Sequence, residues 1–116
     1  MSTAYPVHVE GGSVAVMTFS GQVDRSALTA LNEAYDEVAA TNATSVLLDF
    51  GAVDYINSTG IALIVGVLGR ARAENRHVLA TGLTDHYQRI FSITRLSDFI
   101  AVYPDVTSAL EGASVS

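Results

Sequence analysis

The sequence predicts an α/β fold with a mixed, mostly parallel sheet, an antiparallel hairpin at one edge, and helices packed against the sheet. Apolar runs of strand-like composition alternate with segments that have helical spacing of apolar residues, and such alternation is typical of parallel strands joined by helices. Near the start, two strand-like runs flank Gly11-Gly12, which favours a hairpin. A chain of 116 residues, 49% hydrophobic, can bury one core but leaves little room for another. We therefore expect a single domain over residues 1–116.

The hairpin strands are expected at Val7–Glu10 and Val14–Phe19, and Gly21 is expected to end the second strand. Asp24-Arg25-Ser26 then precedes a segment whose apolar residues share one helical face, with acidic residues off that face. This face consists of Leu28, Leu31, Ala34, Tyr35 and Val38. Residues 41–44 close the helix.

A buried strand is expected at Val46–Phe50, followed by a turn-like stretch and by Asn57-Ser58-Thr59-Gly60, which opens directly into an apolar segment. Ile61–Leu68 is apolar on almost every side, which predicts a helix that is either deeply buried or half-covered by a partner. Glycine costs a helix roughly 1 kcal/mol relative to alanine. We therefore expect the glycines of this helix, Gly66 and Gly69 among them, to permit close approach to the sheet.

The remaining elements continue the alternation. His77–Thr81 is a strand ended by Gly82, and Thr84-Asp85 caps a third helix. The predicted buried face of this helix is Tyr87, Ile90, Phe91 and Ile93. A short strand at Ile100–Tyr103 and a last helical turn at Val106–Glu111 complete the fold.

Composition excludes several classes of function. Twelve acidic residues against six arginines, with no lysine, give a net charge of −6, and such a surface repels nucleic acid and anionic lipid. Cysteine is absent, which removes disulfides and thiolate chemistry, and the dispersed His8, His77 and His86 predict no metal site. The N-terminal segment lacks the pattern of a signal peptide, and Ile61–Leu68 is far shorter than the ~20 residues of a membrane helix. We expect a soluble, cytoplasmic protein.

Asn57-Ser58-Thr59-Gly60 is the most informative block, because it places hydroxyl groups at the start of a helix. Asn57 or Ser58 can serve there as a helix N-cap. A helix start also favours a phosphate, since it offers unpaired N–H groups and a partial positive charge. Neither a nearby histidine base nor the glycine-rich motif of a P-loop accompanies the block. We therefore expect no catalytic residues, and the residues alone leave capping and switching open.

Three blocks of the sequence resemble the STAS domain, the family of sulfate transporter and anti-sigma-factor antagonist domains. Asn57-Ser58-Thr59-Gly60, between a strand and an apolar helix, resembles the signature of the family. Phe19–Asp24 resembles its strand that ends in glycine with a following aspartate. Ala80–Leu83, with Gln88–Phe91 and Arg95-Leu96, resembles its fourth strand and third helix. The similarity spans nearly the whole chain and is strongest to the stand-alone bacterial antagonists.

This resemblance implies a STAS-like fold and a function in partner switching, without enzymatic activity or a cofactor. Ser58 matches the serine phosphorylated by a partner kinase that is also the anti-sigma factor, and a metal-dependent serine/threonine phosphatase reverses the reaction. The unphosphorylated antagonist binds that kinase and releases a sigma factor for transcription. Asp24 matches a loop aspartate near the serine, and the implied partner-binding residues are Asp24, Asn57, Ser58, Thr59 and Gly60. No nucleic acid or membrane partner is implied.

The chain departs from the family pattern at Asn57, where the family commonly has aspartate. Asparagine keeps the capping geometry but removes a negative charge beside the phosphoacceptor. Thr59 is an alternative acceptor, ranked below Ser58. Two other functions stay open: a STAS scaffold that is never phosphorylated, in a signalling or lipid-transport complex, and a small-ligand or nucleotide-binding module of the same fold.

Overall fold

The computed structural model describes residues 5–115. Residues 1–4, in the segment for which we expect no signal peptide, lie outside the described part. In chain order the elements are β1 (Val7–Glu10), β2 (Val14–Val23), α1 (Leu28–Ala39), β3 (Ser45–Ile56), α2 (Ser58–Ala73), β4 (His77–Thr81), α3 (Asp85–Ile93), β5 (Ile100–Tyr103) and α4 (Val106–Val115). Single turns of 3-10 helix precede α1 and β5, at Arg25–Ala27 and Leu96–Asp98.

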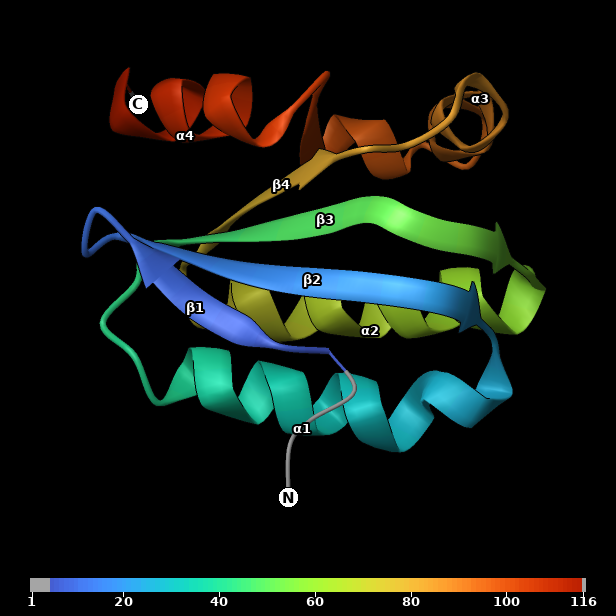
Figure 1. Ribbon diagram of the computed structural model, residues 1–116, viewed down its shortest axis with the longest axis horizontal. Coiled ribbons are helices and arrows are strands. Elements are labelled where there is room, and N and C mark those ends of the chain that lie inside the picture. The colour runs from blue at the N-terminus through green and yellow to red at the C-terminus, as the bar shows by residue number, and fades with distance from the viewer. Residues whose placement is uncertain (1–4, 116) are drawn as a thin grey trace.

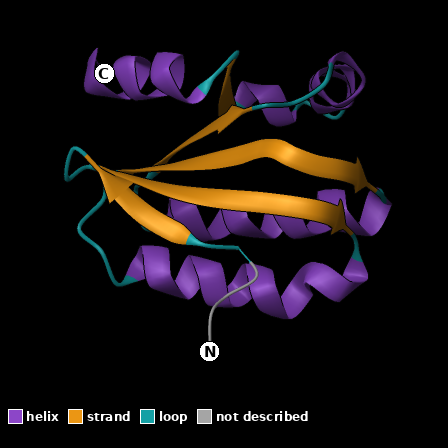
Figure 2. Cartoon of the chain, in the orientation of Figure 1, coloured by secondary structure: helices purple, strands orange, loops and turns teal. Residues whose placement is uncertain are grey.

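The strands form one sheet in the order β1-β2-β3-β4-β5, with β1 antiparallel to β2 and the other neighbours parallel. This confirms the predicted α/β fold, its mostly parallel sheet and its antiparallel edge hairpin. The helices α1 and α2 lie beside each other on one face of the sheet, and α4 lies on the opposite side (Figure 1, Figure 2). No helix in the described part of the chain has the length and apolarity needed to cross a bilayer.

A large apolar core fills the space between the sheet and the helices α1, α2 and α3. Aromatic rings run through it: the ring centroids of Tyr5 and Phe19 are 4.9 Å apart, those of Phe19 and Phe50 4.7 Å, and those of Phe50 and Phe91 6.1 Å. These separations suit offset or edge-on aromatic packing. A smaller cluster under α4 consists of Val14, Val16, Leu47, Leu79 and Ala109. Apolar side chains on both faces explain why the central strands read as continuous apolar runs.

The carboxyl-terminal parts of β2 and β3 extend beyond the rest of the sheet. Pairing between β3 and β4 ends at Asp49 and Thr81, whereas pairing between β2 and β3 continues to Val23 and Ile56. We call the extension, residues 20–23 of β2 and 52–56 of β3, the projecting ribbon. Its end is anchored to α3, because the backbone N–H of Ile56 donates a hydrogen bond of 2.8 Å to the buried hydroxyl of Tyr87.

The projecting ribbon corrects two predictions. Gly21 does not end β2: it adopts a φ of +68°, which glycine tolerates, and the strand passes through a register irregularity and continues to Val23. The stretch after Phe50 is not a turn but the second half of β3. Between Phe50 and Ile56 the side chains are exposed or half-buried, so this segment lacks the apolar run that marks a buried strand.

The predicted helices are confirmed, but some of their predicted faces are wrong. Leu28 is 46% exposed and Ile93 is 74% exposed, because each lies at a helix end, beyond the part that covers the sheet. The last helix is longer than the expected turn at Val106–Glu111 and extends to Val115. The close approach predicted for Gly66 and Gly69 is also wrong, since a Cβ at either position would meet no atom within 4 Å.

Candidate functional site

The start of α2 lies at the end of the projecting ribbon, and Asn57 joins the two. Its side-chain oxygen accepts a hydrogen bond of 2.8 Å from the backbone N–H of Gly60, which makes Asn57 the N-cap of α2. Its own backbone N–H donates to the carbonyl oxygen of Val23 at 3.2 Å, on the neighbouring strand. Of the two candidate caps, the structure therefore selects Asn57.

Ser58 and Thr59 form the exposed first turn of α2. Because Asn57 performs the capping, the hydroxyl of Ser58 is not needed for it, and this hydroxyl hydrogen-bonds to none of the residues that the structure describes. Both hydroxyls stand beside backbone N–H groups of a helix start, where a negative group is favoured. The site thus presents two accessible hydroxyls on a rigid support.

Gly60 supplies much of that rigidity. It is buried, and a Cβ at this position would lie 2.0 Å from the carbonyl oxygen of Val23 and 3.0 Å from the side chain of Ile56. No side chain fits at such a distance, so only glycine lets α2 begin this close to the end of β2. Gly60 lies beneath the predicted partner-binding surface rather than on it.

Asp24 follows Val23 directly, at the same end of the molecule as Asn57 and Ser58 (Figure 1). Its carboxylate accepts hydrogen bonds from the hydroxyl of Ser26 and from the backbone N–H of Ser26, the latter at 2.9 Å. These two hydrogen bonds hold the pKa of Asp24 below its ordinary value. Asp24 is therefore ionised at neutral pH, and it caps the turn that leads into α1.

Other residues at this end were not predicted as site residues. Tyr55 is 52% exposed on the projecting ribbon, beside the acidic and exposed Asp54, and Leu28 is exposed at the start of α1. Tyr55 was missed because its segment was interpreted as a turn. Leu28 was missed because it lies on the periodic apolar face that was assigned to the core. Both side chains add exposed apolar surface at this end of the molecule.

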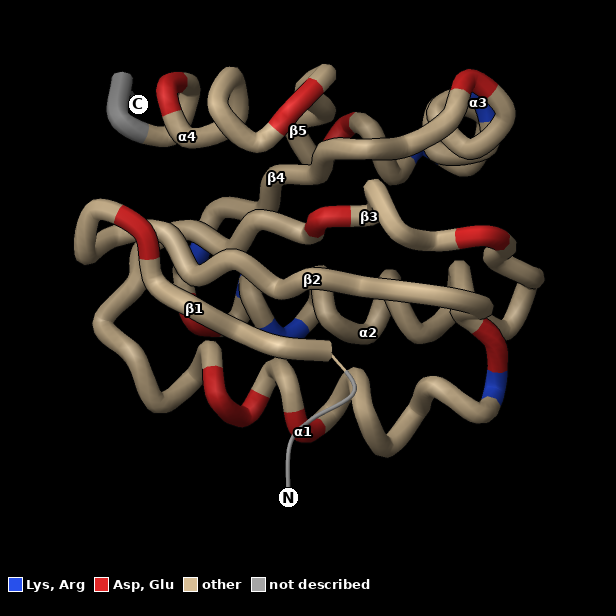
Figure 3. Tube along the Cα trace, viewed as in Figure 1, with Lys and Arg blue, Asp and Glu red and all other residues tan. Residues whose placement is uncertain are grey.

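The surface that continues from Ser58 along α2 carries no charge for three turns. Between Ser58 and Gly69 the helix contains no ionisable residue, and Ala62, Val65 and Gly66 are exposed. Figure 3 shows acidic positions at the ends of the strands and along α1, while this part of α2 is uncharged. This surface confirms that α2 is half-covered rather than deeply buried, because one side of the helix packs on the sheet and the other meets solvent.

The described residues contain no group of three or more histidine, aspartate or glutamate side chains that could hold a metal ion. The arrangement can bind a partner surface and accept a group on a hydroxyl.

Comparisons with known proteins find a matching family model and similar proteins. The family model described as "Mlab, STAS domain" matches residues 8–103. The chain is 32% identical over 91 residues to the anti-sigma-F factor antagonist RsfB of Mycobacterium tuberculosis, covering 68% of this chain and 74% of RsfB. It is 29% identical over 83 residues to the anti-sigma-B factor antagonist of Listeria monocytogenes, covering 72% of this chain and 73% of that protein.

Solved structures share the fold at lower identity. The anti-sigma factor antagonist SpoIIAA in its unphosphorylated form has a TM-score of 0.77 at 13% identity, covering 97% of this chain and 98% of SpoIIAA. The phosphorylated form, from Bacillus, has a TM-score of 0.67 at 14% identity, covering 95% and 99%.

Proposed function

The chain belongs to the STAS domain family, and from that premise we propose that it is an anti-sigma-factor antagonist switched by phosphorylation of Ser58. In its unphosphorylated form it binds an anti-sigma factor that is also a serine kinase, through a surface around Asp24, Asn57, Ser58 and Thr59. The observation that carries the proposal is the exposed hydroxyl of Ser58, which Asn57 relieves of the capping role. Two curated relatives of the chain are named antagonists of anti-sigma factors, and SpoIIAA has been solved in phosphorylated form.

A phosphate on Ser58 would change the surface without unfolding the domain. It adds a charge of about −1.5 to −2, and the helix start offsets part of this by about 0.3–1 kcal/mol. The cap from Asn57 to Gly60 and the contact of Gly60 with Val23 do not involve the Ser58 hydroxyl, so they remain in place. The effect is therefore local to the contact surface.

The new charge would act beside Asp24 and the exposed Arg25, on a surface that is uncharged along α2. Asp24 is already ionised there, and the exposed face of α2 beyond Ser58 carries no charge to compensate a phosphate. A partner that binds the unphosphorylated protein must then remove water from the charged phosphate, or it dissociates. A loss of about 3 kcal/mol at an interface weakens binding more than a hundredfold.

The rest of the proposal follows the family. Anti-sigma-factor antagonists of this family are not enzymes, so the chain acts by binding, and the kinase supplies ATP and magnesium. A metal-dependent serine/threonine phosphatase restores the hydroxyl, the system operates in the cytoplasm, and residues 1–116 form a single STAS domain.

The decisive experiment combines the purified chain, a serine kinase of the anti-sigma-factor class from the same organism, and ATP. Mass spectrometry should find one phosphate on the wild type and on Thr59→Ala, and none on Ser58→Ala. Calorimetry with the same kinase should show tight binding of the unmodified protein and loss of binding after phosphorylation. Undiminished phosphate incorporation by Ser58→Ala would reject the site, and incorporation lost only in Thr59→Ala would move it to Thr59.

A scaffold that is never phosphorylated is the second candidate, and Asn57 is the observation that favours it. The residue caps α2 without the negative charge that aspartate would place beside the acceptor. If no kinase of this class phosphorylates the chain, while the unmodified chain binds a stable partner and Ala62→Glu abolishes that binding, the scaffold function replaces the switch.

A further inference from the structure

The backbone that carries Ser58 is held by a side chain from a distant part of the sequence. The last residue of β3, Ile56, lies two positions before Ser58, and its backbone N–H donates a hydrogen bond of 2.8 Å to the hydroxyl of Tyr87 on α3. Tyr87 is 9% exposed and belongs to the large core between the sheet and the helices. The core therefore holds the strand end from which α2 starts.

This hydrogen bond takes the place of a missing strand. The pairing of β4 with β3 ends at Thr81, so no strand of the described chain lies beside the outer edge of the projecting ribbon. The ribbon pairs with β2 on its other edge, and that pairing contains a register irregularity between Gly21 and Gln22. A buried backbone N–H without a partner is unfavourable. The Tyr87 hydroxyl supplies the partner that β4 does not reach to provide for Ile56.

Tyr87 is itself fixed in position by the start of α3. The side chain of Thr84 accepts a hydrogen bond from the backbone N–H of Tyr87 and caps the helix. The side-chain amide of Gln88 donates a hydrogen bond of 3.0 Å to the carbonyl oxygen of Leu83, in the loop before the helix. The ring of His86 packs edge-on against that of Tyr87, with centroids 4.9 Å apart. The Tyr87 hydroxyl is thus presented from a rigid support.

We propose that Tyr87 is a positioning residue for the phosphorylation of Ser58, an inference that rests on the proposed function. Ile56, Asn57 and Ser58 are consecutive, so a shift of the Ile56 backbone moves both the N-cap of α2 and the acceptor hydroxyl. Phosphoryl transfer requires the attacking oxygen to lie in line with the leaving group, and a displacement of about 1 Å can lower the rate a hundredfold. Because Tyr87 is nearly buried, it acts through this backbone and not by contact with the kinase.

Tyr87→Phe tests this role, because it removes the hydroxyl and keeps the ring in the core. The kinase and ATP of the experiment described above provide the assay. The kcat for phosphorylation of Ser58 should fall at least about tenfold, since the acceptor oxygen is no longer held in place. KM should change much less, because Asp24 and the exposed face of α2 remain available to the kinase.

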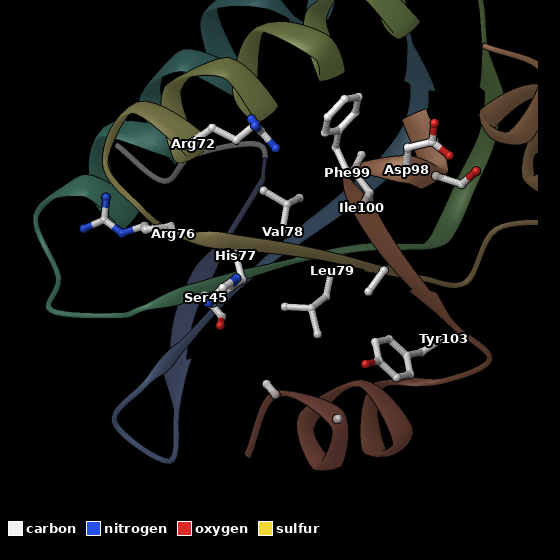
Figure 4. Close-up of a pocket in the computed structure, with 14 residues that line it drawn as sticks. Ser45, Arg72, Arg76, His77, Val78, Leu79, Asp98, Phe99, Ile100 and Tyr103 are labelled. Carbon is white, nitrogen blue, oxygen red and sulfur yellow. The ribbon is translucent and has the colours of Figure 1, made fainter. Parts of the chain in front are cut away.

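Tyr35→Phe is the matched control, because it also removes one tyrosine hydroxyl hydrogen bond. The hydroxyl of Tyr35 donates a hydrogen bond of 3.0 Å to Glu74, just past the end of α2 that is remote from Ser58. Glu74 also pairs with Arg76, which Figure 4 shows beside the cleft of about 360 Å³ that opens where β3 and β4 begin. Tyr35→Phe should leave kcat unchanged. A loss of kcat equal to that in Tyr87→Phe would overturn the proposal, since it would report a general loss of stability.

Hydrogen exchange of the ¹⁵N-labelled protein, followed by NMR, gives a readout that needs no kinase. The amides of Ile56 and Asn57 should exchange at least about tenfold faster in Tyr87→Phe and at the wild-type rate in Tyr35→Phe, since only the first variant opens the end of the ribbon. Unchanged exchange at Ile56 in Tyr87→Phe would overturn the proposal. Absence of phosphate on the wild-type protein would instead reject the proposed function, and the exchange rates would separately decide whether Tyr87 holds the start of α2.

Discussion

The two halves of β3 lie in opposite environments. Residues 45–49 pair on both sides, with β2 and β4, and Val46, Leu47 and Leu48 are fully buried. Residues 52–56 pair with β2 only, and within them only Ile56 is buried. The first half is held by burial of its side chains and by pairing on both sides, whereas the second half is held by pairing with β2 and by a few contacts at its end. Substitutions on the projecting ribbon can therefore change binding with little effect on folding, while its anchors at Val23, Ile56 and Gly60 cannot vary freely.

Truncation of one side chain in each half should separate the two environments most clearly. Leu48→Ala creates a cavity in the core and should lower the free energy of unfolding by about 2–5 kcal/mol. Tyr55→Ala removes a side chain that is 52% exposed and should change it by no more than about 0.5 kcal/mol. Urea denaturation followed by circular dichroism measures both values. Comparable losses in the two variants would show that the ribbon is part of the core.

Glycine substitutions in α2 test the anchor of the ribbon against the exposed surface of the helix. Gly60→Ala forces a methyl group against the carbonyl oxygen of Val23, and shifts of this kind cost about 1–3 kcal/mol or more. Gly69→Ala meets open space and should stabilise the protein by up to about 1 kcal/mol, because alanine favours the helix. The same denaturation experiment measures the opposite signs. Destabilisation by Gly69→Ala would mean that an unseen contact occupies that side of α2.

These differences also explain which features could be predicted from the sequence. The order of strands and helices followed from apolar periodicity, since burial between two layers imposes it on β3 and β4. The carboxyl-terminal half of β3 could not be recognised, because exposed residues on both sides leave no pattern. Leu28 and Ile93 fit their helical periodicity and are nevertheless exposed, since periodicity does not report where a helix passes the edge of the sheet.

The candidate site was predictable as a block but not in its details. Asn57-Ser58-Thr59-Gly60 marked a helix start, and in the structure the backbone N–H of Asn57 bonds to Val23, the residue before Asp24. Which residue caps the helix depended on the geometry of one amide side chain.

Asn57 connects the stability of the ribbon to its proposed function, and two substitutions should divide these roles. Asn57→Ala removes the cap and should lower the free energy of unfolding by about 1 kcal/mol. Asn57→Asp keeps a capping oxygen and adds a negative charge at the helix start, so stability should be equal or slightly higher. Denaturation measures the first role, and the rate of phosphate incorporation on Ser58 measures the second. A stability loss in Asn57→Asp equal to that in Asn57→Ala would contradict the capping geometry.

The smallest expected effect concerns Asp24, on the other strand of the ribbon. Its pKa lies below the ordinary value of 3.8 because Ser26 donates hydrogen bonds from its hydroxyl and its backbone N–H. A carboxyl group with a lowered pKa in the folded state stabilises the fold above its unfolded-state pKa, and this contribution is lost as the pH falls through the folded-state pKa. The change is therefore confined to acid pH, below about 4, and Asp24 keeps its charge at neutral pH.

NMR titration of the side-chain carboxyl carbons measures this pKa directly. Ser26→Ala removes the hydroxyl donor but not the backbone N–H, so the pKa of Asp24 should rise part of the way to its ordinary value. Asp105, whose pKa is lowered by hydrogen bonds from Ser108 and not from Ser26, is the internal reference and should keep its lowered pKa in both proteins. If Asp24 titrates at its ordinary value in the wild type, Ser26 does not hold the turn after β2. The position of the Asp24 carboxylate is then less well fixed than the apolar surface along α2.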